Sequence, residues 1–157
     1  MKKKIGIGLL TALILLQFVR PTRNVSEQII TENDISKKYA IADPVHQILV
    51  KKCYDCHSNN THYPWYTNIQ PVGLWMQHHV NEGKEELNFS EYKAYSERKA
   101  YHKLEEIFDA TNEGWMPLDS YLWIHKEAKI SQEDRDAIND WIKSLGLSFE
   151  KKQKSHQ

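Results

Sequence analysis

Two cysteines and a histidine stand together in the segment Cys53-Tyr54-Asp55-Cys56-His57, and the chain has no other cysteine. Cysteines three positions apart on a helix lie on the same face, one turn apart. From there both sulfurs can form thioether bonds to the two vinyl groups of a porphyrin, and the adjacent imidazole can coordinate the iron. The motif therefore predicts one haem c, attached covalently through Cys53 and Cys56, with His57 as an axial ligand.

Three other uses of the cysteines remain open at this stage. A disulfide between them would close a very short loop and would constrain the unfolded chain little. A thioredoxin-like redox pair needs a motif that opens a helix after a strand, whereas this motif follows a predicted helix. A zinc site would need two further ligands, which only histidines could supply once both cysteines are used.

A sixth iron ligand is expected later in the chain. Met116 lies in Glu113-Gly114-Trp115-Met116-Pro117, where the glycine permits a sharp turn and the proline favours an extended conformation at Met116. Such a loop can bring a thioether to the far face of a haem, so Met116 is the predicted second metal ligand. His125 is the alternative, because it follows the same loop.

Residues 1–20 have the pattern of an export signal, since three lysines precede fifteen largely apolar residues, Ile5 to Val19. This stretch is roughly 22 Å long as a helix, whereas a hydrocarbon core is about 30 Å thick, but Lys4 and Arg20 can reach both interfaces. No small-x-small cleavage site follows, so we favour a membrane-anchor helix over a cleaved signal peptide. The rest of the chain would then face the periplasm, with residues 21–43 as a polar tether.

The charge of the remaining chain excludes a nucleic-acid binder. Residues 1–23 carry five lysines and arginines and no acid, which leaves 16 basic and 21 acidic side chains, a net charge of about −5, for the rest. Phosphate recognition requires a basic face, and this composition does not provide one.

Residues 44–147 are predicted to form an all-α haem-binding domain, followed by a polar tail over 148–157. No segment alternates apolar and polar residues with the period of a strand. Helices are expected from Pro44 into the cysteine motif and over 71–82, 91–110 and 132–145. The predicted N-caps are Asp43, Ser90 and a capping box of Ser131 with Asp134, while Gly83 and Gly146 are expected to end their helices.

This order of elements resembles the cytochrome c fold, in which the first and last helices cross and the haem lies between them. From about residue 5 to 145 the chain resembles the small bacterial haem-binding-domain proteins, a membrane-targeted family related to cytochromes c. Besides the cysteine motif, the resemblance rests on Tyr63-Pro64-Trp65-Tyr66, Pro71-Val72-Gly73, Leu87-Asn88-Phe89-Ser90, Met116-Pro117-Leu118 and Trp123-Ile124-His125.

The resemblance implies covalent haem at Cys53 and Cys56 and iron bound by His57 and Met116. Cytochromes c often use a proline carbonyl to orient the proximal histidine, and the resemblance gives that role to Pro71. The aromatic loop that begins at Tyr63 is expected to cover a porphyrin edge.

We therefore expect a membrane-tethered, periplasmic electron carrier with one haem, and no enzymatic activity or small-molecule substrate. Its partners would be redox proteins with basic docking surfaces. The alternative is a haem enzyme or a gas or redox sensor with a displaceable sixth ligand, and a third hypothesis is a thiol oxidoreductase.

Overall fold

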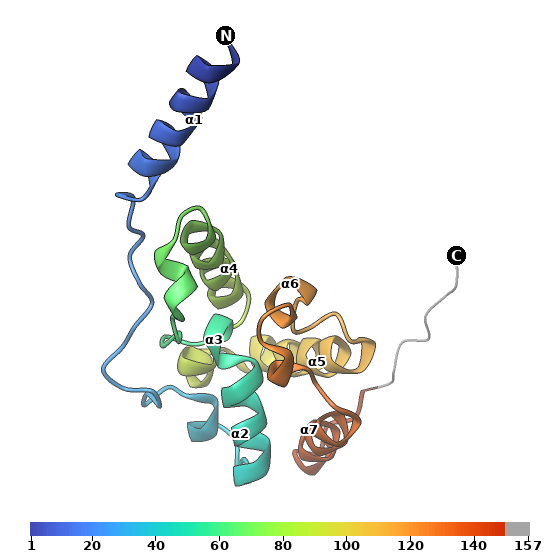
Figure 1. Ribbon diagram of the computed structural model, residues 1–157. Helices are drawn as coiled ribbons and strands as arrows, with labels where there is room; N and C mark the ends of the chain where they lie inside the picture. Colours follow the sequence, from blue (N-terminus) through green and yellow to red (C-terminus); the bar gives the residue numbers. More distant parts are fainter. Residues whose placement is uncertain (150–157) are drawn as a thin grey trace.

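The computed structural model describes residues 1–149, in which every regular element is a helix (Figure 1). In chain order, with η for a 3₁₀ helix, the elements are α1 (Lys2–Leu16), η1 (Ile35–Lys37), α2 (Asp43–Lys52), α3 (Tyr54–His57), η2 (Trp65–Asn68), α4 (Val72–Glu86), η3 (Phe89–Ala94), α5 (Glu97–Glu113), α6 (Asp119–Leu122), η4 (Lys126–Ala128) and α7 (Gln132–Ser144). Residues 1–149 contain no strand, which confirms the all-α fold class. Most of the predicted polar tail, residues 150–157, lies outside the described residues.

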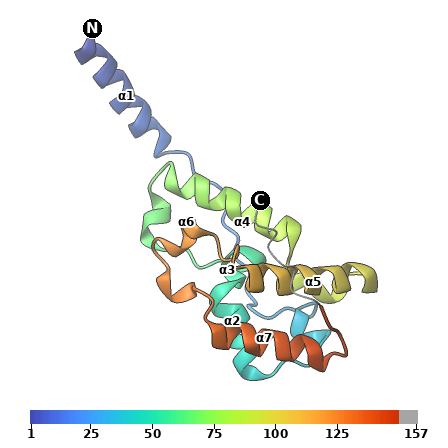
Figure 2. The same cartoon turned by 90° about the vertical axis from the view of Figure 1, so that its right-hand side faces the viewer.

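Helix α1 stands away from the other helices (Figures 1 and 2), and none of its residues is buried. Among the helices of residues 1–149, none combines the length and the apolar character needed to cross a membrane. The membrane-anchor helix that we predicted is therefore not supported.

The segment between α1 and α2 packs against the helical domain, although we expected it to have little structure of its own. The amide of Asn24 donates hydrogen bonds to the Ser58 carbonyl and to the Thr61 hydroxyl, both at 2.8 Å. Asp34 is fully buried and accepts a hydrogen bond from the Tyr54 hydroxyl, and the neighbouring Ile35 is part of the core. These contacts join the segment directly to α3.

The cysteine motif lies at a junction between two helices. Helix α2 has Asp43 and Pro44 in its first turn, where a proline needs no N–H partner, so its N-cap is Ala42 and not the predicted Asp43. The helix breaks at Cys53, which has φ −127° and ψ −38°, and α3 begins at Tyr54. The two cysteines are therefore presented from a bend and not from one continuous helix.

Two other predicted helix boundaries are wrong. Helix α4 continues through Gly83 to Glu86, because the residues that follow the glycine favour helix and, as described below, the glycine serves a tertiary contact. The long helix predicted from Glu91 is split into η3 and α5, and the N-cap of α5 is Ser96, whose hydroxyl accepts a hydrogen bond from the Lys99 amide.

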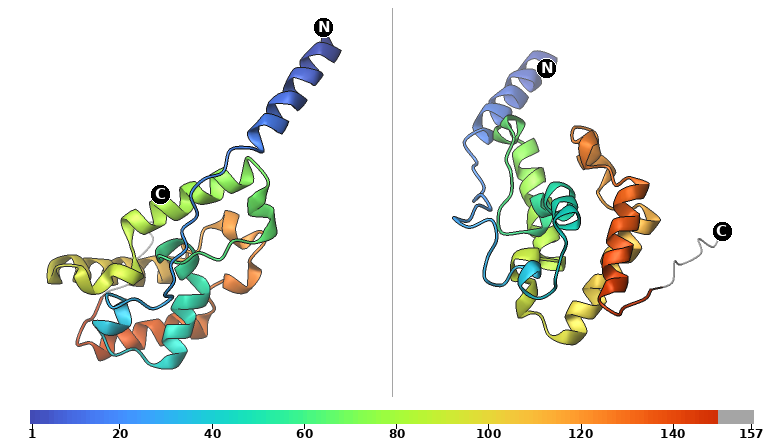
Figure 3. Two further views of the ribbon diagram at one scale, coloured as in Figure 1. Left: turned by 90° about the vertical axis from the view of Figure 1, so that its left-hand side faces the viewer. Right: turned by 90° about the horizontal axis from the view of Figure 1, so that it is seen from below.

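The last helix confirms the predicted capping box. The Ser131 hydroxyl accepts from the Asp134 amide, and the Asp134 carboxylate accepts from the Ser131 amide. Helix α7 packs against both α2 and α5 (Figure 3). The core residues contributed by these three helices are Val45, Leu49, Ala100, Leu104, Ile107, Phe108, Ile138, Trp141 and Ile142.

We expect Ile138→Ala to lower the free energy of unfolding by roughly 2–5 kcal/mol, because Ile138 is fully buried and the truncation leaves a cavity. Urea denaturation followed by circular dichroism measures the change. The matched control is Ile29→Ala, whose side chain is 59% exposed and which should stay within about 0.5 kcal/mol of the wild type. Equal losses in the two variants would contradict the packing described for α7.

Candidate functional site

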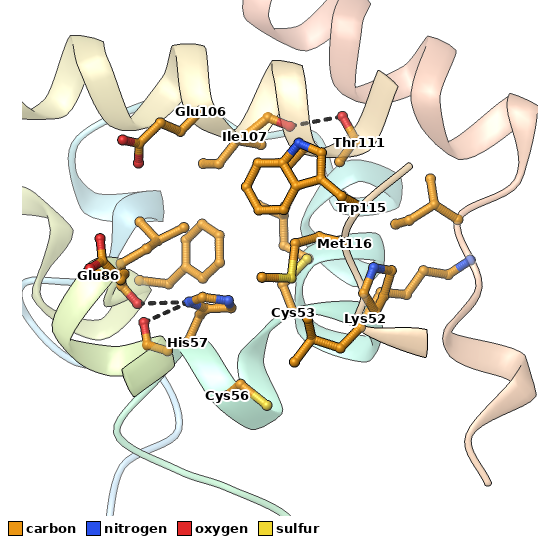
Figure 4. A pocket seen from close by; sticks show the side chains of 18 of the residues that line it. Lys52, Cys53, Cys56, His57, Glu86, Glu106, Ile107, Thr111, Trp115 and Met116 are labelled. Atoms are coloured by element: carbon orange, nitrogen blue, oxygen red, sulfur yellow. Dashed lines mark hydrogen bonds between the residues drawn. The ribbon is translucent and has the colours of Figure 1, made fainter. Parts of the chain in front are cut away.

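A cavity of about 960 Å³ is bordered by α3, α4, α5 and the loop that follows α5. Cys53, Cys56, His57 and Met116, the predicted haem-binding residues, all line it (Figure 4). Pockets for small molecules and cofactors usually have volumes of about 300–1,000 Å³. The cavity is therefore at the upper end of that range and has room for a large, flat cofactor.

The imidazole of His57 is held by the carboxyl end of α4. Its Nδ1 lies 2.7 Å from the Gly83 carbonyl oxygen and 3.1 Å from that of Leu87. Carbonyls accept only, so Nδ1 carries the proton, and Nε2 is left with a lone pair and no hydrogen bond within residues 1–149. Figure 4 shows the ring directed into the cavity with these two bonds on its outer side.

This arrangement replaces the proline carbonyl that the resemblance had given to Pro71. The Gly83 carbonyl oxygen accepts from the Leu87 amide at 2.9 Å and uses its second lone pair for the imidazole, and the Leu87 carbonyl lies just past the end of α4 at Glu86. Burial lowers the pKa of His57, and the two carbonyls only partly oppose this effect. The neutral imidazole, which is the form that binds iron, is thus the form that the site favours.

Gly83 allows α4 to approach the cysteine motif closely. A Cβ atom at this position would lie 2.8 Å from the Cys56 carbonyl oxygen and 3.1 Å from the Cys56 Cβ. A side chain at residue 83 would therefore separate α4 from α3 and move the carbonyl that binds His57. From the sequence we interpreted Gly83 as the end of a helix, because the sequence does not show that Cys56 lies next to it in space.

The two cysteines are free thiols in a shielded environment. Burial raises the pKa of Cys53 to about 12 and that of Cys56 to about 11. A thiol–disulfide oxidoreductase needs a depressed thiol pKa to supply a thiolate, so these values argue against that hypothesis. Within residues 1–149 no group of three or more His, Cys, Asp or Glu side chains is arranged to hold a metal ion, which gives a zinc site no support.

The loop after α5 brings Met116 to the cavity. Helix α5 ends at Glu113, and its C-cap Gly114 has φ +77°, a left-handed conformation that favours glycine. The chain then turns, and Trp115, Met116 and Pro117 all contribute to the cavity wall. In Figure 4 the Met116 sulfur lies toward Cys53 and the interior. The turn predicted from the Gly-Trp-Met-Pro sequence is thus present.

A hydrogen bond between Asp55 and Tyr121 ties this loop to the cysteine motif. The Tyr121 hydroxyl donates to the Asp55 carboxylate at 2.7 Å, and both residues line the cavity. Burial and the adjacent carboxylate raise the pKa of Tyr121, so its hydroxyl stays protonated as a donor. Sequence reasoning missed this pair, because no local signal links residues that are 66 positions apart.

His125, the alternative sixth ligand, is not among the residues that line the cavity. Its Nε2 lies 2.5 Å from the Tyr66 hydroxyl oxygen, its Nδ1 lies 3.3 Å from a Glu127 carboxylate oxygen, and its ring stacks on Tyr121 at 4.4 Å. The histidines that do line the cavity with His57 are His79 and His102. Neither stands in a motif that would mark it as a haem ligand.

Carboxylates dominate the charged side chains of the cavity wall formed by α4 and α5. Glu82, Glu86, Glu105 and Glu106 line it, and Lys103 bridges Glu106 at 2.6 Å and Glu86 at 3.6 Å. This acidic wall favours positive charge in and around the cavity. The sequence had indicated an acidic domain but not where its acids gather.

The aromatic loop at 63–66 is placed differently from our expectation. We predicted that it covers a porphyrin edge, but none of its residues lines the cavity, and the Trp65 side chain is 74% exposed. The loop is instead held by the Tyr66–His125 contact and by the Tyr63 hydroxyl, which donates to the Gln77 side chain at 2.8 Å.

The side chains that border the cavity fit a haem. An imidazole with a free Nε2, a thioether sulfur and two thiols are the groups with which proteins ligate haem iron and bond the porphyrin edge. No curated protein and no solved structure matches the chain. The profile of the haem-binding domain family matches residues 11–144, a range that includes every residue lining the cavity. The chain is therefore a member of the haem-binding domain family.

Proposed function

We propose that this protein is a c-type cytochrome domain with one haem and that it carries electrons. Cys53 and Cys56 would hold the haem through thioether bonds, and His57 and Met116 would be the axial ligands of its iron. The observation that carries this proposal is that one cavity is lined by all four residues, with the Nε2 of His57 free on its inner side.

A bound haem supplies a one-electron couple between ferric and ferrous iron. The Cys53 and Cys56 thiols would each add across a vinyl double bond, with the sulfur bonded to one vinyl carbon and the thiol hydrogen to the other. The Gly83 and Leu87 carbonyls hold the imidazole of His57 in the tautomer that presents Nε2. A neutral thioether from Met116 favours the ferrous state over a second imidazole and so raises the reduction potential.

An electron carrier is favoured over an enzyme or a sensor because the Met116 loop is fastened. The Tyr121–Asp55 hydrogen bond holds the chain just after the loop to α3, and α5 holds the chain before it. A sensor needs a sixth ligand that leaves readily, and this fastening opposes that. The packing of α7 against α2 further supports a cytochrome c-like arrangement of the first and last helices of the domain.

The proposed location is the periplasmic side of a bacterial inner membrane, where residues 1–20 would direct export. The acidic cavity wall and the net charge of about −5 beyond residue 23 favour redox proteins with basic docking surfaces as partners. Nucleic acid remains an unsuitable partner on the same charge grounds.

We expect Met116→Ala to abolish the long-wavelength thioether band of the oxidised protein, because that band requires sulfur on the iron. The reduction potential should fall by on the order of 100 mV, since the axial ligand is the main control of haem potential. Carbon monoxide should bind the reduced variant readily and leave the reduced wild type unchanged. Absorption spectra recorded during a redox titration measure all three effects.

The matched control is Met76→Ala, which truncates a half-buried methionine of α4 that does not line the cavity. This variant should keep the thioether band. A Met116→Ala protein with the band intact would refute the ligand assignment. Ready binding of carbon monoxide by the wild type would favour the haem enzyme or sensor instead.

A further inference from the structure

Outside α1 and its end, most of the exposed large apolar side chains come from two parts of the chain. The first part runs from η2 to the start of α4 and includes Trp65, Ile69, Val72 and Trp75. The second part, Trp123 and Ile124, follows α6. Trp65 and Trp123 are each 74% exposed. Contiguous exposed apolar surface marks a site of interaction, whereas single exposed residues need no explanation. We call these six residues the aromatic face.

A contact between adjacent residues brings the two parts of the aromatic face close together. The Tyr66 hydroxyl lies 2.5 Å from the Nε2 of His125, so the residue after Trp65 is bonded to the residue after Ile124. Val72 and Trp75 are three positions apart on α4 and therefore lie on one side of that helix. The six side chains thus belong to segments that are neighbours in space. Tyr66 and His125, which join these segments, are 59 positions apart in the sequence.

The same part of the domain is fixed to the end of α1. Gln17 donates to the Gln70 carbonyl at 3.1 Å and accepts from the Gln70 amide at 3.0 Å. Arg20 donates to the Asn68 carbonyl at 2.7 Å, and Arg23 donates to the Asn68 side chain at 2.6 Å. Asn68 and Gln70 flank Ile69 of the aromatic face. Figures 1 and 2 show α1 extending outward from this end of α4.

The end of α1 continues the apolar surface and adds positive charge. Phe18 is 79% and Val19 47% exposed, and the residues of α1 are exposed all around the helix. Arg20 and Arg23 are also exposed, and Lys2 to Lys4 precede the apolar stretch. Tryptophan side chains favour the headgroup level of a bilayer, and lysines and arginines near it are attracted to anionic lipids.

We propose that the aromatic face contacts the surface of an anionic phospholipid bilayer and that the neighbouring apolar helix α1 inserts into the same bilayer. The hydrogen bonds of Gln17 and Arg20 fix the domain relative to α1, so a helix that enters the interface brings Trp65 and Ile69 down with it. This contact orients the haem domain on the membrane. The inference rests on the proposed function in one respect: the proposed export decides which side of the membrane is contacted. It does not depend on the identity of the haem ligands.

The test uses the full chain with its haem and vesicles of phosphatidylglycerol and phosphatidylcholine. The variant is Trp65→Ser combined with Trp123→Ser, and binding is measured by co-sedimentation. We expect its partition into the vesicles to fall by at least about tenfold, because two large side chains lose their contact with lipid. In the wild type, vesicles should slow hydrogen exchange at the amides of residues 65–70.

The matched control is Ile29→Ser combined with Tyr101→Ser, which removes two exposed apolar side chains outside the aromatic face. This control should bind as the wild type does. Unchanged binding by the tryptophan variant, or unchanged exchange at residues 65–70, would overturn the proposal. A shift of the tryptophan variant from dimer to monomer without loss of vesicle binding would also overturn it, because a second copy would then cover the face.

The haem spectrum, recorded on the same samples, separates this proposal from the electron-carrier function. A protein with an intact thioether band that does not bind vesicles refutes the membrane contact alone. A protein that binds vesicles but lacks the band refutes the ligand assignment alone.

Discussion

A protein in which Cys53 and Cys56 are both replaced by alanine will lose its haem on extraction with acid acetone, whereas the wild type will keep it. The reason is that the variant has no sulfur left to bond a vinyl group, so its haem is held only by the iron ligands and by packing. Acid protonates the imidazole of His57 and so breaks its bond to the iron. Mass spectrometry of the polypeptide should show the added tetrapyrrole in the wild type and not in the variant.

The two single variants are the controls for this experiment. Cys53→Ala and Cys56→Ala each keep one thiol beside the cavity, and each should retain some haem through one thioether bond. A wild-type protein that is matured in a host with the haem-attachment machinery, yet carries no added mass, would refute covalent attachment. The acid-acetone experiment thus tests haem c separately from haem binding as such.

Gly83→Ala is expected to destabilise the protein and to reduce its haem content. The new Cβ would lie 2.8 Å from the Cys56 carbonyl oxygen, so α4 must move away from α3. Overpacking of this kind costs about 1–3 kcal/mol of unfolding free energy. The Gly83 carbonyl moves with the helix, so the bond to His57 Nδ1 weakens, and the haem-loaded fraction should fall. Urea denaturation and the ratio of haem to protein absorbance measure the two effects.

Gly8→Ala is the control for this substitution. Gly8 also lies within a helix, but a Cβ atom there meets nothing within 4 Å. Alanine is a better helix former than glycine by up to about 1 kcal/mol, so the control should be neutral or slightly stabilising. A Gly83→Ala protein as stable and as fully loaded as the wild type would contradict the close contact between α3 and α4.

Local signals predicted the parts of this protein that depend on residues near one another in the chain. The capping box of α7 needs only Ser131 and Asp134, three positions apart, and it forms as expected. The turn before Met116 needs only Gly114 and the residues beside it. The all-α class followed from the helical spacing of apolar residues. In each of these cases the interacting groups are covalent neighbours or one helical turn apart, so the amino-acid order contains the geometry.

Other features were predicted wrongly or were not predicted, because they depend on contacts with residues that are distant in the sequence. Gly83 has the character of a helix end by itself, but its absent side chain makes room for Cys56. Ser90 has the character of an N-cap, yet it is fully buried, and its hydroxyl accepts from the Asn59 amide at 3.0 Å. Ser96 takes the capping role instead. Local propensities are weak, and packing overrides them where the two disagree.

The sequence by itself determined that sulfur and imidazole stand together at residues 53–57, because that spacing is a covalent property of the chain. It also determined that Met116, the proposed sixth ligand, lies in a loop between a glycine and a proline. The tertiary structure alone decided that these groups share one cavity, that helix α4 orients His57 across 26 positions, and that Tyr121 fastens the Met116 loop across 66. Contacts at such separations form only when whole helices pack together. The local sequence therefore does not indicate which carbonyl will bind His57 or which carboxylate will bind Tyr121.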